Sequence, residues 1–112
     1  MPLDAQIESI LFWKGEPLSL KKLAVILDKT EEEIGKGIDE LEKKLGNRGL
    51  QLIRKDDEIM LGTQAGMSAI IEKLIKEELV RDLGKAGLET LSIILYRGPV
   101  TRRDIDYIRG VN

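Results

Sequence analysis

Residues 30–45, TEEEIGKGIDELEKKL, carry the clearest local pattern of the chain and decide its fold. Thr30 and Glu33 have the spacing of a capping box, in which each side chain accepts a hydrogen bond from the other residue's backbone N–H at a helix start. Apolar residues then recur at i, i+4, i+7 and i+11, and Gly46 follows as the expected C′ residue. The stretch therefore predicts an amphipathic helix over 31–45 that buries Ile34, Ile38, Leu41 and Leu45.

Two shorter helices are expected before this stretch. Apolar residues at helical spacing over residues 3–14 predict the first helix, and Gly15 followed by Pro17 ends it. Ser19 can cap a second helix that extends to Leu27, because a serine hydroxyl accepts a hydrogen bond from an unpaired N–H of the first turn. The first half of the chain is therefore mainly helical.

The residues after the third helix predict a β-hairpin. Two stretches rich in aliphatic side chains, 50–55 and 58–63, flank Asp56-Asp57, which forms a short acidic turn. A fourth helix is expected over residues 67–75. Three helices followed by a two-stranded ribbon is the order of a winged helix. We therefore predict a mainly α fold with a small β-hairpin, an α+β winged helix-turn-helix.

Beyond the fourth helix the order of elements starts again. Apolar residues over 88–95 predict a helix, and Thr101 with Asp104 three positions later, a shorter relative of the capping box, begins another. A third helix would follow where the sequence stops at Asn112, so we expect a fragment of a longer protein. The predicted organisation is a first winged-helix domain over 1–76, a connection over 77–84 and an incomplete second winged helix, with two helices, over 85–112. The polar stretch 77–84 suits a connection or the tail of the fourth helix.

The expected truncation has a physical consequence for the two tail helices. Without a third helix to cover them, they are expected to expose an apolar patch, which in water favours association. The patch would consist of Leu88, Leu91, Ile94, Leu95, Ile105 and Ile108. We expect the 112-residue chain to self-associate more than a version cut near Gly84, which sedimentation would measure.

The composition leaves few residue types for chemistry. The chain has no Cys and no His, which excludes disulfides, thiolate nucleophiles, Cys-based metal sites and imidazole acid–base catalysis. The remaining types do not assemble a nucleophile, base and oxyanion site, and Gly35-Lys36-Gly37 lacks the spacing of a phosphate-binding loop. We therefore expect no enzymatic activity, no cofactor and no small-molecule substrate. The longest apolar runs, 10–13 and 93–96, are too short to cross a bilayer, so a cytoplasmic protein without membrane contact is expected.

Four stretches, which together cover nearly the whole chain, match the pattern of a known family. They are ILFWKGEPLSLKKLAVIL at 10–27, TEEEIGKGIDELEKKL at 30–45, RGLQLIRKDDEIMLGT at 48–63 and LETLSIILYRGPVTRRDIDYIRGVN at 88–112. The last is the most specific, through its string Tyr-Arg-x-Pro-x-Thr-Arg-x-x-Ile-x-x-Ile-Arg-Gly-Val. In these stretches the sequence resembles segregation and condensation protein B, ScpB, of the bacterial and archaeal SMC–kleisin complex. It departs from that family by ending at Asn112, where family members usually continue with a Ser that caps a further helix.

The resemblance implies a scaffold rather than an enzyme. Members of the family resemble one another in having tandem winged-helix domains, forming homodimers largely through the first domain, and binding the kleisin ScpA with a prominent part for the second. ScpA in turn bridges the SMC ATPase heads, so ATP hydrolysis belongs to SMC. By this resemblance we expect a non-enzymatic accessory subunit of chromosome condensation and segregation, located in the cytoplasm at the nucleoid. Functions that need an intact second domain are in doubt for this chain.

A winged helix also suits a DNA-binding transcription regulator, which is the alternative function. In such proteins the third helix commonly enters the major groove. Here Glu31, Glu32 and Glu33 occupy the N-terminal turn of that helix, where they complement the helix dipole and would repel phosphates. We therefore expect direct DNA binding to be weak or absent, and a salt-dependent gel shift on duplex DNA distinguishes the two functions.

Two groups of residues are candidates for contact with other proteins. Phe12 and Trp13 extend the apolar surface of the first helix sideways, and they either pad the core or widen a surface for a dimer or another partner. The tail arginines form either a solvated face, partly neutralised by Asp104 and Asp106, or a contact with phosphate or an acidic kleisin segment. Tyr96 would supply apolar area to such a contact or belong to the core. The candidate kleisin contact comprises Tyr96, Arg97, Pro99, Arg102, Arg103 and Arg109.

Overall fold

The capping box at the start of the third helix forms as the sequence predicts. In a computed structural model, which describes residues 1–82 and 99–110, this helix is α3, Glu31–Leu45. The Thr30 hydroxyl accepts a hydrogen bond from the Glu33 N–H at 3.1 Å, and the Glu33 carboxylate accepts one from the Thr30 N–H at 3.2 Å. Gly46 ends the helix as predicted, but it is the C-cap residue, in the right-handed helical conformation, and not the expected C′ residue.

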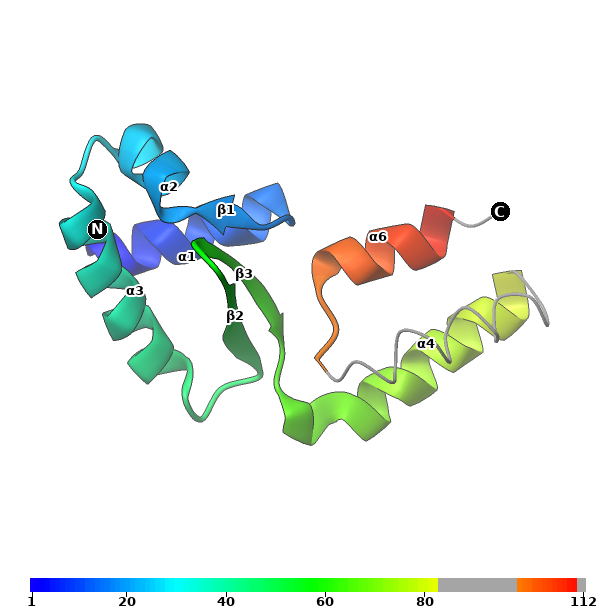
Figure 1. Cartoon of the computed structure of the whole chain (residues 1–112). Coiled ribbons are helices and arrows are strands. Elements are labelled where there is room, and N and C mark those ends of the chain that lie inside the picture. Colours follow the sequence, from blue (N-terminus) through cyan, green and yellow to red (C-terminus); the bar gives the residue numbers. More distant parts are fainter. Residues whose placement is uncertain (83–98, 111–112) are drawn as a thin grey trace. The chain divides into compact units, whose positions relative to one another are not determined.

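The first unit of the chain, residues 1–61, holds the other two predicted helices (Figure 1). Gly15 ends the first of them in the left-handed conformation, with φ 64°, which glycine adopts without a steric penalty. Ser19 caps the second, as predicted, by accepting a hydrogen bond from the Lys22 N–H at 3.0 Å. In chain order the unit comprises α1 Leu3–Lys14, β1 Leu18–Ser19, α2 Leu20–Leu27, α3, β2 Leu50–Lys55 and β3 Glu58–Thr63, of which β3 extends into the second unit.

The sheet has three strands where the sequence predicts two. The hairpin β2–β3 has the predicted bounds, and Asp56 takes the left-handed conformation in its turn, with φ 58°. β1 adds a third strand, antiparallel to β3, with Leu18 opposite Ile59 in the sheet order β1-β3-β2. The predicted two-stranded hairpin is therefore corrected to a small three-stranded antiparallel sheet in a mainly helical α+β fold. A strand of two residues is too short to show any periodicity in the sequence.

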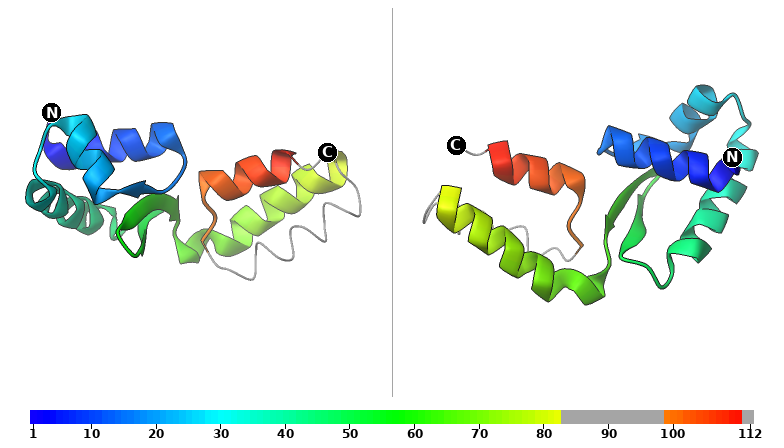
Figure 2. Two further views of the ribbon diagram at one scale, coloured as in Figure 1. Left: turned by 45° about the horizontal axis from the view of Figure 1, so that its top comes forward. Right: turned by 180° about the vertical axis from the view of Figure 1, so that it is seen from behind.

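The core of the first unit lies between α3 and the elements packed against it, which are α1, α2 and β2 (Figure 2). All four apolar residues of the predicted α3 face are buried, and Ile38 is 1% exposed. The backbone of α3 approaches α1 closely at Gly37, where an added Cβ would lie 2.8 Å from Ile7 Cδ1. The buried cluster consists of Ile7, Leu11, Leu18, Leu23, Ile34, Ile38, Leu41, Leu45, Leu52 and Ile59.

Two glycines of α3 give a matched pair of substitutions with different expected results. Gly35→Ala should raise the free energy of unfolding by about 1 kcal/mol, because Ala favours a helix and no atom lies within 4 Å of the added Cβ. Gly37→Ala should be less stable than Gly35→Ala by at least about 1 kcal/mol, since the added Cβ would lie 2.8 Å from Ile7 Cδ1 and force the completely buried Ile7 side chain to shift. Urea unfolding of both variants tests this, and equal stabilisation would show that Gly37 is not needed for helix packing.

The second unit, residues 62–112, is described over 62–82 and 99–110. It contains the 3₁₀ turn η1 Ala65–Met67 and the helices α4 Ser68–Asp82 and α6 Arg102–Gly110. α4 runs through Glu77–Asp82, so this part of the expected connection is the tail of a helix. Thr101 and Asp104 begin α6 as predicted, with reciprocal hydrogen bonds of 3.0 and 3.1 Å. The helix predicted over 88–95 falls outside the described residues, and the division into two winged-helix domains stays a prediction.

Short backbone contacts hold the segment before α6 in the second unit. Gly62 forms an antiparallel bridge with Thr101, and the Thr63 N–H donates to the Val100 carbonyl at 2.9 Å. α4 and α6 lie side by side in both views of Figure 2. Ile108 is 3% exposed and Ile105 is half-buried, so the expectation that these two belong to an exposed patch is wrong. None of the helices in the described ranges is long and apolar enough to span a membrane.

Candidate protein-interaction surfaces

Phe12 and Trp13 lie on the exposed side of α1. Their exposed fractions are 66% and 75%, so the interpretation that they pad the core is wrong. The preceding Leu11 is buried, and each later residue turns about 100° around the helix axis, which carries both aromatic side chains away from the core. Large exposed aromatic side chains are typical of the centres of protein interfaces.

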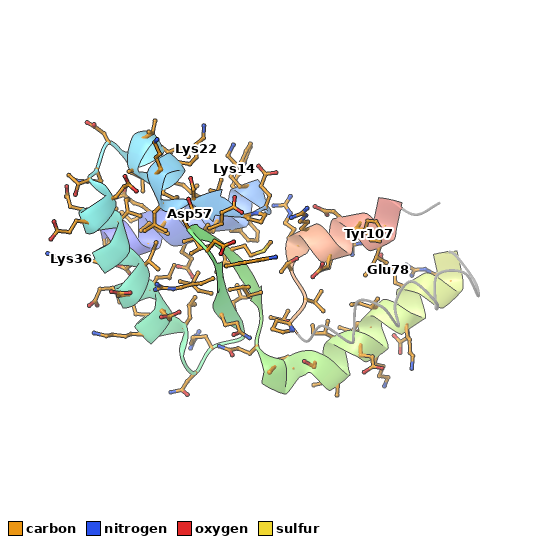
Figure 3. All side chains as sticks on the ribbon, in the orientation of Figure 1. Lys14, Lys22, Lys36, Asp57, Glu78 and Tyr107 are labelled. Carbon is orange, nitrogen blue, oxygen red and sulfur yellow. The ribbon has the colours of Figure 1, made fainter. Side chains whose placement is uncertain are left out.

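Trp13 lines a hollow between α1 and α2, which we call the α1–α2 hollow. Its volume is about 460 Å³, and Ile10 and Ile26 supply further apolar surface. Two lysines border it, Lys14 and Lys22 (Figure 3), and Lys14 Nζ lies 6.0 Å from the centroid of the Trp13 ring. The complete lining is Ser9, Ile10, Trp13, Lys14, Lys22 and Ile26.

The acidic side chains of α3 act within the fold. Arg54 of β2 donates to Asp39 at 3.0 Å and to Glu42 at 3.4 Å, which ties the hairpin to the helix. The hydrogen bond from the Thr30 N–H holds the pKa of the Glu33 carboxyl below its ordinary value, so this group is ionised at neutral pH. With Glu31 and Glu32 beside it, the N-terminal turn of α3 is strongly negative and opposes contact with phosphates.

An ion pair links the start of α1 to the end of α3. Lys44 Nζ donates to Asp4 Oδ2 at 2.8 Å, and the Asp4 side chain is only 11% exposed. This hydrogen bond lowers the pKa of the Asp4 carboxyl and raises the pKa of the Lys44 ammonium. Both charged forms are therefore favoured by folding at neutral pH.

The Asp4–Lys44 pair predicts that stability falls with acidification. The pKa of the Asp4 carboxyl is lower in the folded chain than in the unfolded one. The contribution of this carboxyl to the free energy of unfolding is therefore present above its pKa in the unfolded chain, about 4, and is lost as pH falls through its lower pKa in the folded chain. Glu33 adds to the loss in the same direction. The contribution of the Lys44 ammonium to the free energy of unfolding is lost instead at high pH, as pH rises above the ordinary lysine pKa of 10.5 and through the raised pKa of the folded chain.

Asp4→Asn gives the measurement for this prediction. The variant should unfold at lower urea concentration than the parent chain at pH 7, and the difference should shrink as pH falls towards about 3. Circular dichroism at each pH follows unfolding. A difference that is the same at pH 7 and at about pH 3 would show that the side-chain amide costs stability for a reason other than the lost ion pair.

The arginines of the candidate kleisin contact have different neighbours in the structure. Arg109 donates to Glu78 of α4 at 2.7 and 3.3 Å, so it joins the two helices. Arg102 Nε lies 4.0 Å from Asp106 one turn later in α6. Arg103 is exposed and has no carboxylate within ion-pair distance among residues 1–82 and 99–110. Pro99 is half-buried, while Tyr96 and Arg97 lie outside the described residues.

One exposed aromatic residue of α6, Tyr107, is not among the surface candidates predicted from the sequence (Figure 3). Tyr107 is 63% exposed and follows Arg103 by one helical turn, so the two share a side of the helix. We call them the Arg103–Tyr107 patch. The inward positions of Ile105 and Ile108 in the helical period could have placed Tyr107 outside. Lys14, Lys22 and Ile26 were overlooked as well, because their meeting with Trp13 depends on how α1 packs beside α2.

These features define a class of protein: a small, mainly helical α+β module with aromatic, lysine and arginine side chains exposed on its surface. Comparison with known sequences gives the family. The chain belongs to the family of the segregation and condensation complex subunit ScpB, whose family model matches residues 5–112. This family is that of a non-enzymatic condensin subunit.

Individual relatives agree with this assignment. Segregation and condensation protein B of Clostridium tetani is 44% identical over 109 residues, which cover 94% of this chain and 57% of that protein. The protein from Clostridium botulinum strain Kyoto is 39% identical over 107 residues, which cover 94% of this chain and 55% of that protein. The chain thus spans about half the length of the curated relatives it matches.

Two solved structures are similar to the fold. The crystal structure of ScpB from Mycobacterium tuberculosis has a TM-score of 0.65 and 28% identity, and the match covers 98% of this chain and 70% of that chain. A crystal structure of a dimer of the ScpB N-terminal domain complexed with an ScpA peptide has a TM-score of 0.64 and 29% identity. That match covers 68% of this chain and 94% of the other.

Proposed function

We propose that this chain is a dimerising scaffold that binds the kleisin ScpA and so serves chromosome condensation and segregation at the nucleoid. The observation that carries the proposal is the likeness to an ScpB N-terminal domain that was crystallised as a dimer with an ScpA peptide. Phe12 and Trp13 are the candidates for the dimer or partner surface, because both are large, aromatic and exposed. The Arg103–Tyr107 patch is the candidate for the contact with ScpA in the second unit.

We further propose that the first unit is a winged helix used for protein contact. Its order of elements, α1-β1-α2-α3-β2-β3, with β1 beside β3, supports the assignment. In a winged helix that reads DNA, α3 would approach phosphates with its N-terminal turn, which here carries three glutamates. The charge of α3 therefore disfavours the alternative of a transcription regulator. By the same proposal, residues 85–112 begin a second winged helix.

Co-expression with the cognate ScpA tests the scaffold. We expect the tagged chain to retain ScpA through purification and to sediment as a dimer. Failure of both this chain and a version extended to the length of its relatives to bind ScpA would reject the proposal. For the alternative function, a gel shift on duplex DNA should show no specific band at about 150 mM salt, whereas tight binding that weakens steeply with salt would favour a DNA reader.

A further inference from the structure

The α1–α2 hollow has the size and lining of a docking site for side chains of another molecule. Its volume of about 460 Å³ lies within the range of roughly 300–1,000 Å³ that is usual for ligand sites. Ile10, Trp13 and Ile26 form its apolar part, and Trp13 and Ile26 are 75% and 41% exposed. Apolar side chains exposed side by side around a hollow mark a surface that another molecule covers.

The charges around the hollow indicate the charge of the molecule that would bind there. Its lining includes Lys14 and Lys22 and no carboxylate, although the chain as a whole has a net charge of -2. Within the described part of the chain, neither lysine has a carboxylate within ion-pair distance. Both ammonium groups are thus available to an acidic partner, while their aliphatic stems can cover apolar side chains.

A second copy of the chain does not suit the hollow. In a two-fold symmetric dimer the same patch of each protomer meets itself, so an axis through the hollow would bring Lys14 and Lys22 close to their own copies. Like charges facing one another across an interface cost free energy, and the hollow holds no acidic group to compensate. A two-fold axis through the hollow is therefore disfavoured, and its positive charge favours a segment that carries carboxylates.

We propose that the α1–α2 hollow docks an acidic amphipathic helix of a partner protein. Aliphatic side chains at i, i+3 and i+4 of that helix enter the hollow against Ile10, Trp13 and Ile26, and flanking carboxylates pair with Lys14 and Lys22. This site belongs to the first unit, whereas the residues of the Arg103–Tyr107 patch belong to the second. It does not rest on the identity of ScpA, so its failure would leave the co-purification test of the proposed function untouched.

Trp13 is the sole tryptophan of the chain, and its emission therefore reports on the hollow. The probe is a synthetic 18-residue peptide without Trp or Tyr, with Leu on one face and Glu on both flanks. We expect a saturable blue shift of Trp13 emission on titration, because a docked helix excludes water from the indole. The same peptide with Lys in place of Glu should give no shift, and added salt should weaken binding of the acidic one.

A pair of double variants provides the control. Lys14→Glu combined with Lys22→Glu should lower the affinity for the acidic peptide at least tenfold. Lys36→Glu combined with Lys43→Glu makes the same charge change on α3, outside the lining of the hollow, and should change that affinity by no more than about twofold. Circular dichroism verifies folding, and Lys14→Met with Lys22→Met tests the lost charge alone. The proposal is overturned if the two double variants weaken binding equally, if no shift occurs, or if the emission shifts with chain concentration alone, since a second copy would then fill the hollow.

Discussion

Replacing Ile38 with Ala is expected to lower the free energy of unfolding by about 3 kcal/mol. Ile38 is 1% exposed and lies in the middle of the α3 face that packs on α1 and α2. The change removes three carbon atoms from a cluster in which ten apolar side chains are buried together, and leaves a cavity that the neighbours fill only in part. A loss of this size is a large share of the stability of a small domain.

Val25→Ala is the matched control for this prediction. Val25 is 72% exposed on α2, so its truncation loses little buried area, and Ala is the better helix former. Its effect should stay within about 0.5 kcal/mol. Urea unfolding followed by circular dichroism compares the two variants. If Ile38→Ala costs no more than Val25→Ala, the packing of α3 is not what holds the first unit together.

The features of the fold that sequence predicts well are those set by neighbouring residues. The capping box of Thr30 and Glu33, the cap of Ser19 on α2 and the bounds of the β2–β3 hairpin all match. Each depends on groups within a few positions, so the local pattern contains the necessary information. The periodicity of α3 likewise identifies its buried face, because a helix turns by a fixed angle per residue.

The features that sequence misses depend on contacts between distant segments. β1 exists because Leu18 and Ser19 pair with Ile59 and Glu58, about forty positions later, and a strand of two residues has no pattern of its own. Gly46 was expected one position beyond the C-cap of α3, yet it is the C-cap itself, and the chain continues from it with a turn. The route towards β2, rather than the residue type, decides how this helix ends.

The candidate surfaces show the same division. Phe12 and Trp13 were left open between core and partner, since the sequence does not say whether another element covers that side of α1. The pairing of Arg109 with Glu78 spans 31 positions and gives this arginine a carboxylate partner within the second unit. Residue type alone treats Arg102, Arg103 and Arg109 alike, whereas the fold assigns them different neighbours.

Changing the Arg103–Tyr107 patch should strongly weaken the proposed contact with ScpA. We expect Arg103→Glu combined with Tyr107→Ala to reduce affinity for the cognate ScpA at least tenfold, or about 1.4 kcal/mol. Arg103→Glu replaces a guanidinium, which can donate hydrogen bonds to carboxylates, by a carboxylate, which repels them. Tyr107→Ala removes an aromatic ring that is 63% exposed. Neither side chain contributes to the buried core, so the fold of the second unit should persist. Titration calorimetry with purified ScpA measures the affinity.

The control for this loss is Lys73→Glu combined with Ile70→Ala on α4. It makes the same change of charge and also truncates a large side chain, because Lys73 is exposed and Ile70 is 55% exposed. If long-range attraction between ScpA and the net charge of the chain dominated binding, both double variants would weaken it alike, and the loss would fade at high salt. A specific contact at the patch instead predicts a loss confined to the α6 variant that persists in about 0.5 M salt, where the Debye length is only a few ångströms.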